Sequence, residues 1–284
     1  MTRLTACHRT RYRYASPVGF GPHRLMLCPK GQHDVRLIDN EILCTPPARL
    51  DWSQDVFGNL VATAHFTGHA SEMVIESRFT IDHKAEAWPI FAIDPVVHDY
   101  PFRYSDGDCN ALGAYLIPNH PDPDGTLMTW ARGFVAGDRT DTLALLKDLA
   151  NGIWPILFYR ERDEEGTQAP LETLALGSGS CRDFATLFID AARALGFGAR
   201  AVSGYLAGDP THASNSTHAW AEIYLPGAGW IACDPTHGTV GGRGLIPVAV
   251  ARAITQIMPI EGSFLGAPGD FIDMQVDVTI EPVA

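Results

Sequence analysis

The strongest constraint on the fold is a change in the spacing of apolar residues along the chain. In residues 4–84 apolar and polar residues alternate in short runs, as in residues 60–66 and 72–81. A period of two predicts strands that bury one face. Turn residues separate these runs at Ser16-Pro17, Pro29-Lys30-Gly31, Thr45-Pro46-Pro47 and Phe57-Gly58-Asn59. The pattern predicts an antiparallel β-sandwich as a first domain, residues 1–90.

Beyond this region the spacing becomes helical. Residues 126–135 form a short candidate helix, and residues 141–150 repeat apolar residues at intervals of three and four. Between the two patterns, the Pro- and Asp-rich residues 87–124 predict an irregular connection. Residues 274–280 alternate again, and we expect this strand to return to the N-terminal sheet. The chain therefore predicts an α+β fold with a second domain in residues 91–284.

Length and composition exclude several classes of protein. The chain has 284 residues, 46% of them hydrophobic, and at about 150 residues per domain this length allows two modest domains or one large one. Lys and Arg total 21 against 33 Asp and Glu, a net charge of -12, and no basic run suggests a nucleic-acid partner. No apolar stretch approaches the roughly 18 residues of a membrane span, and no apolar run marks a secretory signal. We expect a cytoplasmic protein, and we interpret the charged residues 160–166 as a solvated loop.

Six cysteines stand at positions 7, 28, 44, 109, 181 and 233, without a C-x-x-C pair or the spacing of a zinc finger. A chain of this size needs no disulfide framework, so we expect neither disulfides nor structural zinc. No two histidines on a predicted helix have the i, i+4 spacing beside a carboxylate that zinc sites use, so we expect no metal and no other cofactor. The remaining question is whether one thiol is placed to act as a nucleophile.

Cys181 stands at the predicted start of a buried helix. Ser180 and Asp183 have the spacing of a capping box, and Gly196 predicts the end of the helix. One apolar stripe contains Phe184, Leu187, Phe188, Ala191 and Leu195. Cys181 lies on this stripe in the first turn, where the helix dipole and free N–H groups favour a thiolate and can bind an oxyanion. A small buried core residue would suit the same position.

A predicted β-hairpin supplies a histidine and a carboxylate. Two alternating runs flank a Pro-Gly-Ala-Gly turn at residues 226–229, with His218 entering the first strand and Asp234 ending the second. Together with a helix-start cysteine they form the nucleophile, base and orienting residue of thiol acyl transfer. His212 and His237 remain alternatives for the base, although neither begins a strand of the hairpin.

The register of the hairpin tests this grouping. Side chains alternate between the two faces of a sheet, so only an even register places His218 and Asp234 on one face. We predict an even register, for example with Pro226 opposite Trp230 and Gly229 in a bulge. An odd register would remove Asp234 from the triad.

Several motifs together resemble the bacterial transglutaminase-like family, whose members are described as cysteine proteases. The core motifs are residues 176–185 (LGSGSCRDFA), 203–205 (SGY), 218–222 (HAWAE), 229–230 (GW) and 234–236 (DPT). Residues 16–18 (SPV), 23–25 (HRL) and 55–59 (DVFGN) are similar to the family's N-terminal β-domain. The resemblance covers nearly the whole chain and implies a papain-like, transglutaminase-like core behind an N-terminal β-domain.

The resemblance implies a role for each residue of the triad. Cys181 would be the nucleophile, His218 the base and Asp234 the orienting residue. The chain departs from the family at Ser180, where Val is common, and at His237, where Asn is expected. The second departure places a spare imidazole near the site.

The remaining site residues are less constrained by the sequence. Six residues before Cys181, where papain-type enzymes carry an oxyanion-binding glutamine, the chain has Ala175. Trp154 and Gln168 are the candidate oxyanion donors. Arg182 is a candidate for binding a substrate carboxylate or a neighbouring loop.

The sequence thus predicts a thiol enzyme that acts on a protein or peptide substrate through an acyl-thioester intermediate. We favour hydrolysis of a peptide, isopeptide or related amide bond, because uncontrolled cross-linking would harm a cytoplasm and no acidic calcium loop is present. Transfer of the acyl group to an amine, as in protein-glutamine cross-linking, is the alternative reaction. A non-enzymatic binding module with a vestigial site is the alternative class.

Overall fold

The computed structural model describes residues 2–86, 89–162, 164–207 and 217–283. Its first part consists of antiparallel strands. They are β1 (Thr2–Phe20), β2 (His23–Leu25), β3 (Val35–Thr45), β4 (Ala48–Gln54), β5 (Leu60–Phe66) and β6 (His69–His83). The strands predicted at residues 60–66 and 72–81 are confirmed as β5 and part of β6. Ser16-Pro17 does not end a strand, because β1 continues to Phe20 through a shift in its register.

These strands form two sheets that share one core. One sheet has the order β17-β1-β6-β3 with β18 also paired to β1, and the other has the order β16-β2-β5-β4. The short strands are β16 (Ile260–Glu261) and β17 (Phe264–Leu265), and β18 spans Phe271–Pro282. The core between the sheets contains Tyr14, Phe20, Leu25, Ala64 and Ile75. The period-two pattern therefore buries one face of each sheet against the other.

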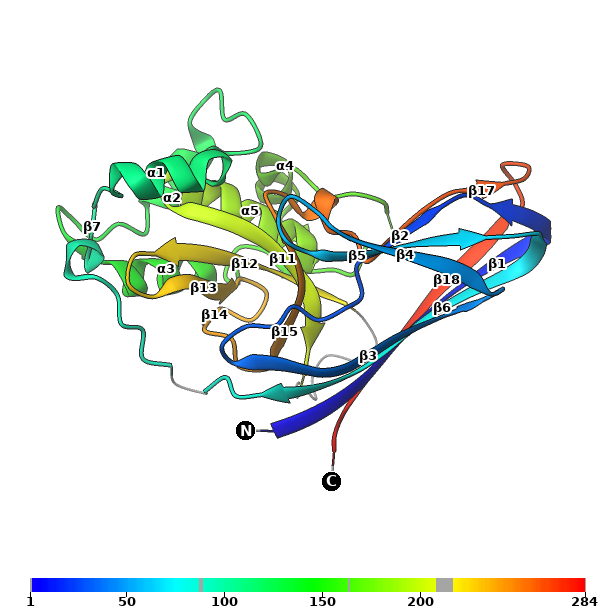
Figure 1. Ribbon diagram of the computed structural model, residues 1–284. Coiled ribbons are helices and arrows are strands. Elements are labelled where there is room, and N and C mark those ends of the chain that lie inside the picture. Colours follow the sequence, from blue (N-terminus) through cyan, green and yellow to red (C-terminus); the bar gives the residue numbers. More distant parts are fainter. Residues whose placement is uncertain (1, 87–88, 163, 208–216, 284) are drawn as a thin grey trace.

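The C-terminal strand returns to the beginning of the chain, as expected from its alternation. Strand β18 pairs with β1 from Leu4 opposite Pro282 to Tyr14 opposite Phe271. Figure 1 shows the two strands side by side and both chain ends at the same end of the molecule. The sheets of the first part therefore contain residues from both ends of the chain.

In the second part of the chain, helices pack against an antiparallel sheet. Its helices are α1 (Asp106–Leu112), α2 (Thr126–Arg132), α3 (Thr142–Asn151), α4 (Pro170–Leu176) and α5 (Cys181–Ala194), with 3-10 turns η1 (Pro95–Val97), η2 (Gly113–Leu116) and η3 (Ile254–Gln256). Its sheet, in the order β14-β13-β12-β11-β15, contains β11 (Gly198–Leu206), β12 (His218–Leu225), β13 (Gly229–Asp234), β14 (Thr239–Val240) and β15 (Leu245–Ala251). The short pairs are β7 (Asp99–Tyr100) with β8 (Thr140–Asp141), and β9 (Phe158–Tyr159) with β10 (Ser178–Gly179). Helix α5 packs on β11 and β12.

The expected irregular connection contains more structure than the sequence pattern suggested. Helix α1 lies within it, and the hydroxyl of Ser105 accepts a hydrogen bond from the N–H of Asp108 at 3.1 Å. This N-cap stabilises helix α1 in a segment whose apolar residues show little helical periodicity. Of the described residues, no helix is long and apolar enough to cross a membrane.

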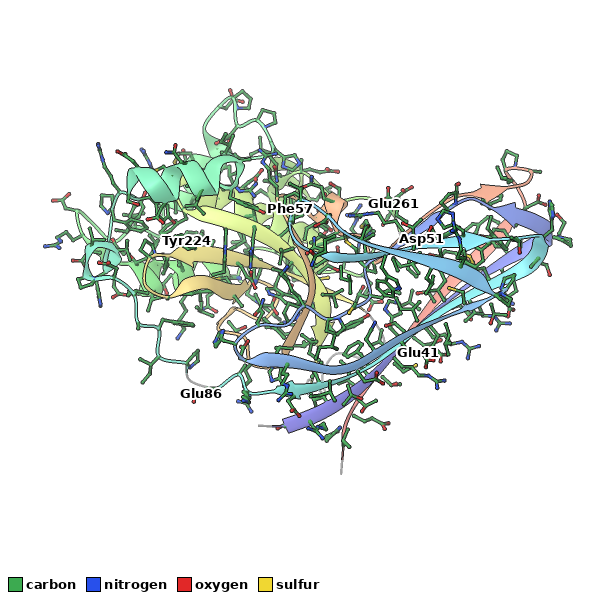
Figure 2. All side chains as sticks on the ribbon, in the orientation of Figure 1. Glu41, Asp51, Phe57, Glu86, Tyr224 and Glu261 are labelled. Atoms are coloured by element: carbon green, nitrogen blue, oxygen red, sulfur yellow. The ribbon has the colours of Figure 1, made fainter. Side chains whose placement is uncertain are left out.

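The two parts are joined by side chains as well as by the chain. The side chain of Asn59, in the loop between β4 and β5, donates to the carbonyl of Val250 at 2.7 Å and accepts from its N–H at 2.8 Å. Phe57 in the same loop lies at the junction, its ring centroid 6.4 Å from that of Tyr115 (Figure 2). A pair of bonds that mimics strand pairing therefore fixes the sheets of the first part on β15.

Candidate active site

The first turn of α5 is fixed around Cys181 by a capping box. Both the N–H and the hydroxyl of Ser180 donate to Oδ2 of Asp183, each at 2.8 Å. The predicted cap is confirmed, and Gly196 with a φ of 94° follows the end of the helix. Gly179 lets Asp183 approach this closely, because a Cβ at residue 179 would lie only 2.9 Å from the Cβ of Asp183. The thiol therefore stands on a rigid helix start.

Asp183 also binds the loop before α4. Its carboxylate, which is fully buried, accepts from the N–H of Gln168 at 2.8 Å and from Nη1 of Arg162 at 2.7 Å. Burial alone would raise the pKa of Asp183, but these hydrogen bonds outweigh burial and hold it below its ordinary value. The expectation of a solvated charged run is wrong for Arg162, because its guanidinium is the counter-charge of a buried carboxylate and is only 10% exposed.

The hairpin brings His218 and Asp234 together on one face. Leu225 pairs with Gly229 and the register is continuous to Ala221 opposite Cys233, so the even register is confirmed with a three-residue loop. The two side chains are diagonal neighbours rather than direct partners, and Nε2 of His218 lies 2.7 Å from Oδ2 of Asp234. Both residues are buried.

A second imidazole shares the same carboxylate oxygen. Nδ1 of His237 lies 2.7 Å from Oδ2 of Asp234, while Oδ1 accepts from the N–H of Thr236 at 2.9 Å. Burial alone would raise the pKa of Asp234, but the charges and hydrogen bonds of His218 and His237 lower it well below its usual range. Asp234 is therefore held as a carboxylate between two rings.

His218 is electrostatically coupled to both other candidate residues. Burial alone would lower its pKa, but the charge of Asp234, the hydrogen bond to Asp234 and a hydrogen bond to Cys181 outweigh burial and raise it. Because Nε2 binds Asp234, Nδ1 is the ring nitrogen left for the thiol. The arrangement therefore favours the imidazolium form of His218 beside Cys181.

Cys181 and His218 line a cavity of about 500 Å³. Trp154 and Gln168, the candidate oxyanion donors, are not among the residues that line it. Trp154 is more than half exposed elsewhere, and the side-chain oxygen of Gln168 accepts from the hydroxyl of Thr173 at 3.1 Å. Gln168 instead contributes its backbone N–H to Asp183.

Arg182 lines the cavity but binds the neighbouring loop. Its Nη2 donates to the carbonyl of Arg162 at 2.9 Å and to the carbonyl of Glu164. Of the two roles considered for Arg182, the geometry favours holding this loop.

Tyr159 is a cavity residue that the sequence did not point out. It lies in β9, pairs with Gly179 and lines the cavity with Cys181. Burial, followed by the negative charge of Cys181, raises the pKa of Tyr159 to about 12. Its phenol is therefore protonated at neutral pH. A strand of two residues leaves no periodic signal by which Tyr159 could have been found.

The other cysteines do not line this cavity. All six cysteines are free thiols in the structure. Burial raises the pKa of Cys28 and of Cys44 to about 11, and raises that of Cys233 further. These thiols are therefore protonated and unreactive at neutral pH.

The site also offers a possible set of metal ligands. Ligand atoms of His218, Asp234 and His237 all lie within 4.8 Å of one another. Their spacing along the chain is not that of a helical zinc motif, so the sequence did not point to them as metal ligands. In the structure these atoms are hydrogen-bonded to each other. His212, the other alternative base, lies outside the described residues.

Comparison with known proteins gives consistent matches along the chain. The transglutaminase-like superfamily matches residues 128–235, and the bacterial transglutaminase-like N-terminal region matches residues 4–82. An uncharacterised protein of Mycobacterium tuberculosis is 28% identical over 290 residues, covering 97% of this chain and 92% of that protein. The protein-glutamine gamma-glutamyltransferase of Pseudomonas aeruginosa is 37% identical over 67 residues, which cover 21% of this chain and 10% of that enzyme.

A solved structure from Cytophaga hutchinsonii, described as a "Putative Cysteine Protease", has a TM-score of 0.73 to this chain. The two are 20% identical, over 98% of this chain and 90% of that one. This similarity establishes a shared fold over nearly the whole chain.

Proposed function

Because this chain belongs to the transglutaminase-like superfamily, we propose that it is a cysteine enzyme that transfers the acyl group of an amide through a thioester on Cys181. The observation that carries the proposal is the geometry of the cavity. A cysteine at a helix start and a histidine bound to a buried carboxylate line the same space, with 2.7 Å between His218 and Asp234. These are the parts that nucleophilic acyl transfer requires.

The first half of the reaction forms the thioester. The Cys181 thiolate attacks the amide carbonyl carbon, a C–S bond forms, and the carbonyl electron pair moves to oxygen. The N–H of Cys181 and the Tyr159 hydroxyl are the donors proposed for this oxyanion. As the oxyanion collapses and the C–N bond breaks, the His218 imidazolium gives its proton to the leaving amine. Asp234 holds the imidazole ring throughout.

The second half returns the Cys181 thiolate and the His218 imidazolium. Neutral His218 removes a proton from a water molecule, the hydroxide oxygen bonds to the thioester carbon, and the C–S bond breaks to give a carboxylic acid. We propose water as the acceptor, and hence hydrolysis of a peptide, isopeptide or related amide bond in a protein or peptide. A primary amine in place of water would give amine transfer.

Amine transfer is the second candidate, favoured by the 67-residue match to the Pseudomonas aeruginosa enzyme. The two reactions are separated by incubating the protein with a glutamine-containing peptide and an isotopically labelled primary amine. Mass spectrometry should find deamidation or cleavage in excess of amine incorporation. The opposite ratio would replace hydrolysis by amine transfer.

The existence of an active thiol is tested separately. Iodoacetamide at mildly acidic pH should alkylate Cys181 much faster than Cys109, an exposed cysteine in the same chain. His218→Ala should remove this advantage, because the imidazolium no longer favours the thiolate. Equal rates at the two cysteines in the unaltered protein would favour a binding module with a vestigial site.

A further inference from the structure

The cavity at Cys181 has two chemically different sides. Cys181, Arg182 and Tyr159 come from α5 and the strand beside it. The apolar side comes from the segment after η3 and from β18, and contains Ile257, Met258, Pro259, Met274 and Val276. The second part of the molecule thus supplies the reactive groups, whereas the returning C-terminal strand supplies apolar surface.

The apolar residues of β18 lead out of the protein core and into this cavity. Val278, Val276 and Met274 alternate along the strand and therefore share one face. Val278 is 1% exposed, Val276 is partly buried and Met274 is 52% exposed. The same row that packs in the core is thus uncovered where it meets the cavity.

The charged groups of the cavity disfavour an anionic substrate group. The guanidinium of Arg162 is bound to Asp183, and that of Arg182 donates to backbone carbonyls. The carboxylate of Glu161 also lines the cavity. Binding of an anion would therefore require breaking contacts that hold the loop, and would meet a like charge.

The apolar lining continues beyond the cavity. Met258 also lines a neighbouring cavity of about 390 Å³, whose wall includes Tyr12, Tyr14, Phe264 and Phe271. A peptide longer than one residue therefore finds further apolar and aromatic surface on the far side of Met258.

We propose that the acyl donor carries an apolar side chain next to the amide that is attacked, and that this side chain binds against Met258, Met274 and Val276. The inference rests on the proposed function, because it assigns the substrate class of the same site. When an apolar group of the substrate covers the exposed apolar surface beside the nucleophile, the free energy of the complex falls. The C-terminal strand is then part of the substrate-binding site as well as of the sheet.

Peptide aldehydes test this without requiring turnover. The Cys181 thiolate adds to the aldehyde carbon, forming a C–S bond, and the new oxyanion takes up the proton held by His218, which gives a reversible hemithioacetal. N-acetyl-leucinal, N-acetyl-aspartal and N-acetyl-lysinal are compared by the concentration that protects Cys181 from iodoacetamide. Leucinal should protect at a concentration at least about tenfold lower than aspartal or lysinal.

Two variants on β18 separate binding from folding. Met274→Glu places a charge in the cavity, whereas Ile272→Glu makes the same change at a residue of the strand that is 56% exposed and does not line the cavity. Met274→Glu should reverse the preference, so that lysinal protects better than leucinal. Ile272→Glu should keep the original order. A reversal cannot arise from loss of folding.

The outcomes test the substrate class and the proposed function separately. Equal protection by the three aldehydes, or an unchanged order in Met274→Glu, would overturn the assignment of the substrate class and leave the active thiol intact. Failure of all three aldehydes to protect, together with slow alkylation of Cys181, would overturn the proposed function and the substrate class with it.

Discussion

The site contains two buried carboxylates, Asp183 in the first turn of the Cys181 helix and Asp234 bound to His218, and they differ in the partners that hold them. Asp183 binds backbone N–H groups and the guanidinium of Arg162. Asp234 binds one backbone N–H and two imidazoles. Both pKa values are lowered by these partners against the effect of burial. A guanidinium keeps its charge at any relevant pH, whereas an imidazole exchanges its proton, so only the Asp234 side can take part in proton transfer.

The sharpest test of this contrast uses two histidines. His218→Ala should lower kcat/KM for amide turnover by about 10³-fold or more, because the base and the acid for the leaving amine are removed together. A matched control is His120→Ala, since His120 also binds a buried carboxylate, Asp190 of α5, at 2.8 Å. His120 does not line the cavity.

The control should keep kcat/KM within about threefold of the unaltered protein, because His120 has no part in the proposed proton transfer. A comparable loss in both variants would mean that removing a histidine from any buried aspartate disturbs the fold enough to stop the reaction. The proposed role of His218 in proton transfer would then be contradicted.

The next largest loss of kcat/KM is expected for Asp234→Asn. Removing the negative charge should lower the pKa of His218, since the charge of Asp234 is the main cause that raises it against burial. We expect a loss of about 10²-fold in kcat/KM. The rate at which iodoacetamide alkylates Cys181 is measured from pH 4 to 9 in both proteins. The variant should be slowest relative to the unaltered protein at pH values where only the variant has lost its imidazolium. An unchanged pH profile would show that Asp234 does not act on the ring.

Asp183→Asn should act on stability rather than on proton transfer. It removes the buried counter-charge of Arg162 and leaves only the exposed carboxylate of Glu164, 3.5 Å from Nε of Arg162, which costs about 3 kcal/mol in the free energy of unfolding. Urea unfolding followed by circular dichroism measures this loss. The double variant Arg162→Met with Asp183→Asn should recover much of it, because no unpaired charge remains.

The loss should also depend on pH in a defined direction. A carboxylate with a lowered pKa stabilises the folded state fully above its ordinary pKa and loses this contribution as the pH falls through its lowered value. The difference between the unaltered protein and Asp183→Asn should therefore be largest near pH 7 and shrink below about pH 4. A constant difference down to pH 2 would contradict the role given to the ionised form.

What the sequence predicted well was local. The cap formed by Ser180 and Asp183 spans four residues, and the face shared by His218 and Asp234 follows from the even register of one hairpin. The return of β18 could also be expected, because its alternation matched that of the first strands. Short spacings carry such information because the backbone of one element fixes where its side chains point.

What the sequence did not reveal depends on contacts between distant segments. Arg162 stood in a charged run, and nothing local distinguished it from its exposed neighbours. Tyr159 lay in a strand of two residues, too short for any periodicity. The sequence indicated only that Met274 belongs to an alternating strand. Its place in the cavity follows from how β18 packs beside the second part. Likewise His237 was noted as a departure from the family, but its bond to Asp234 required the fold of the chain after β13.

The smallest expected effect tests whether the two imidazoles on Asp234 are equivalent. His237→Asn keeps a donor near Oδ2 of Asp234, whereas His237→Ala removes it. Because Thr236 and His218 still bind Asp234, the net loss should correspond to one hydrogen bond, about two- to tenfold in kcat/KM for Ala and less for Asn. A loss near that of His218→Ala in both variants would instead place His237 in the proton transfer. His218, which lines the cavity with Cys181, would then share the proton transfer with His237, and the contrast would lie between Asp183 and a relay of two histidines.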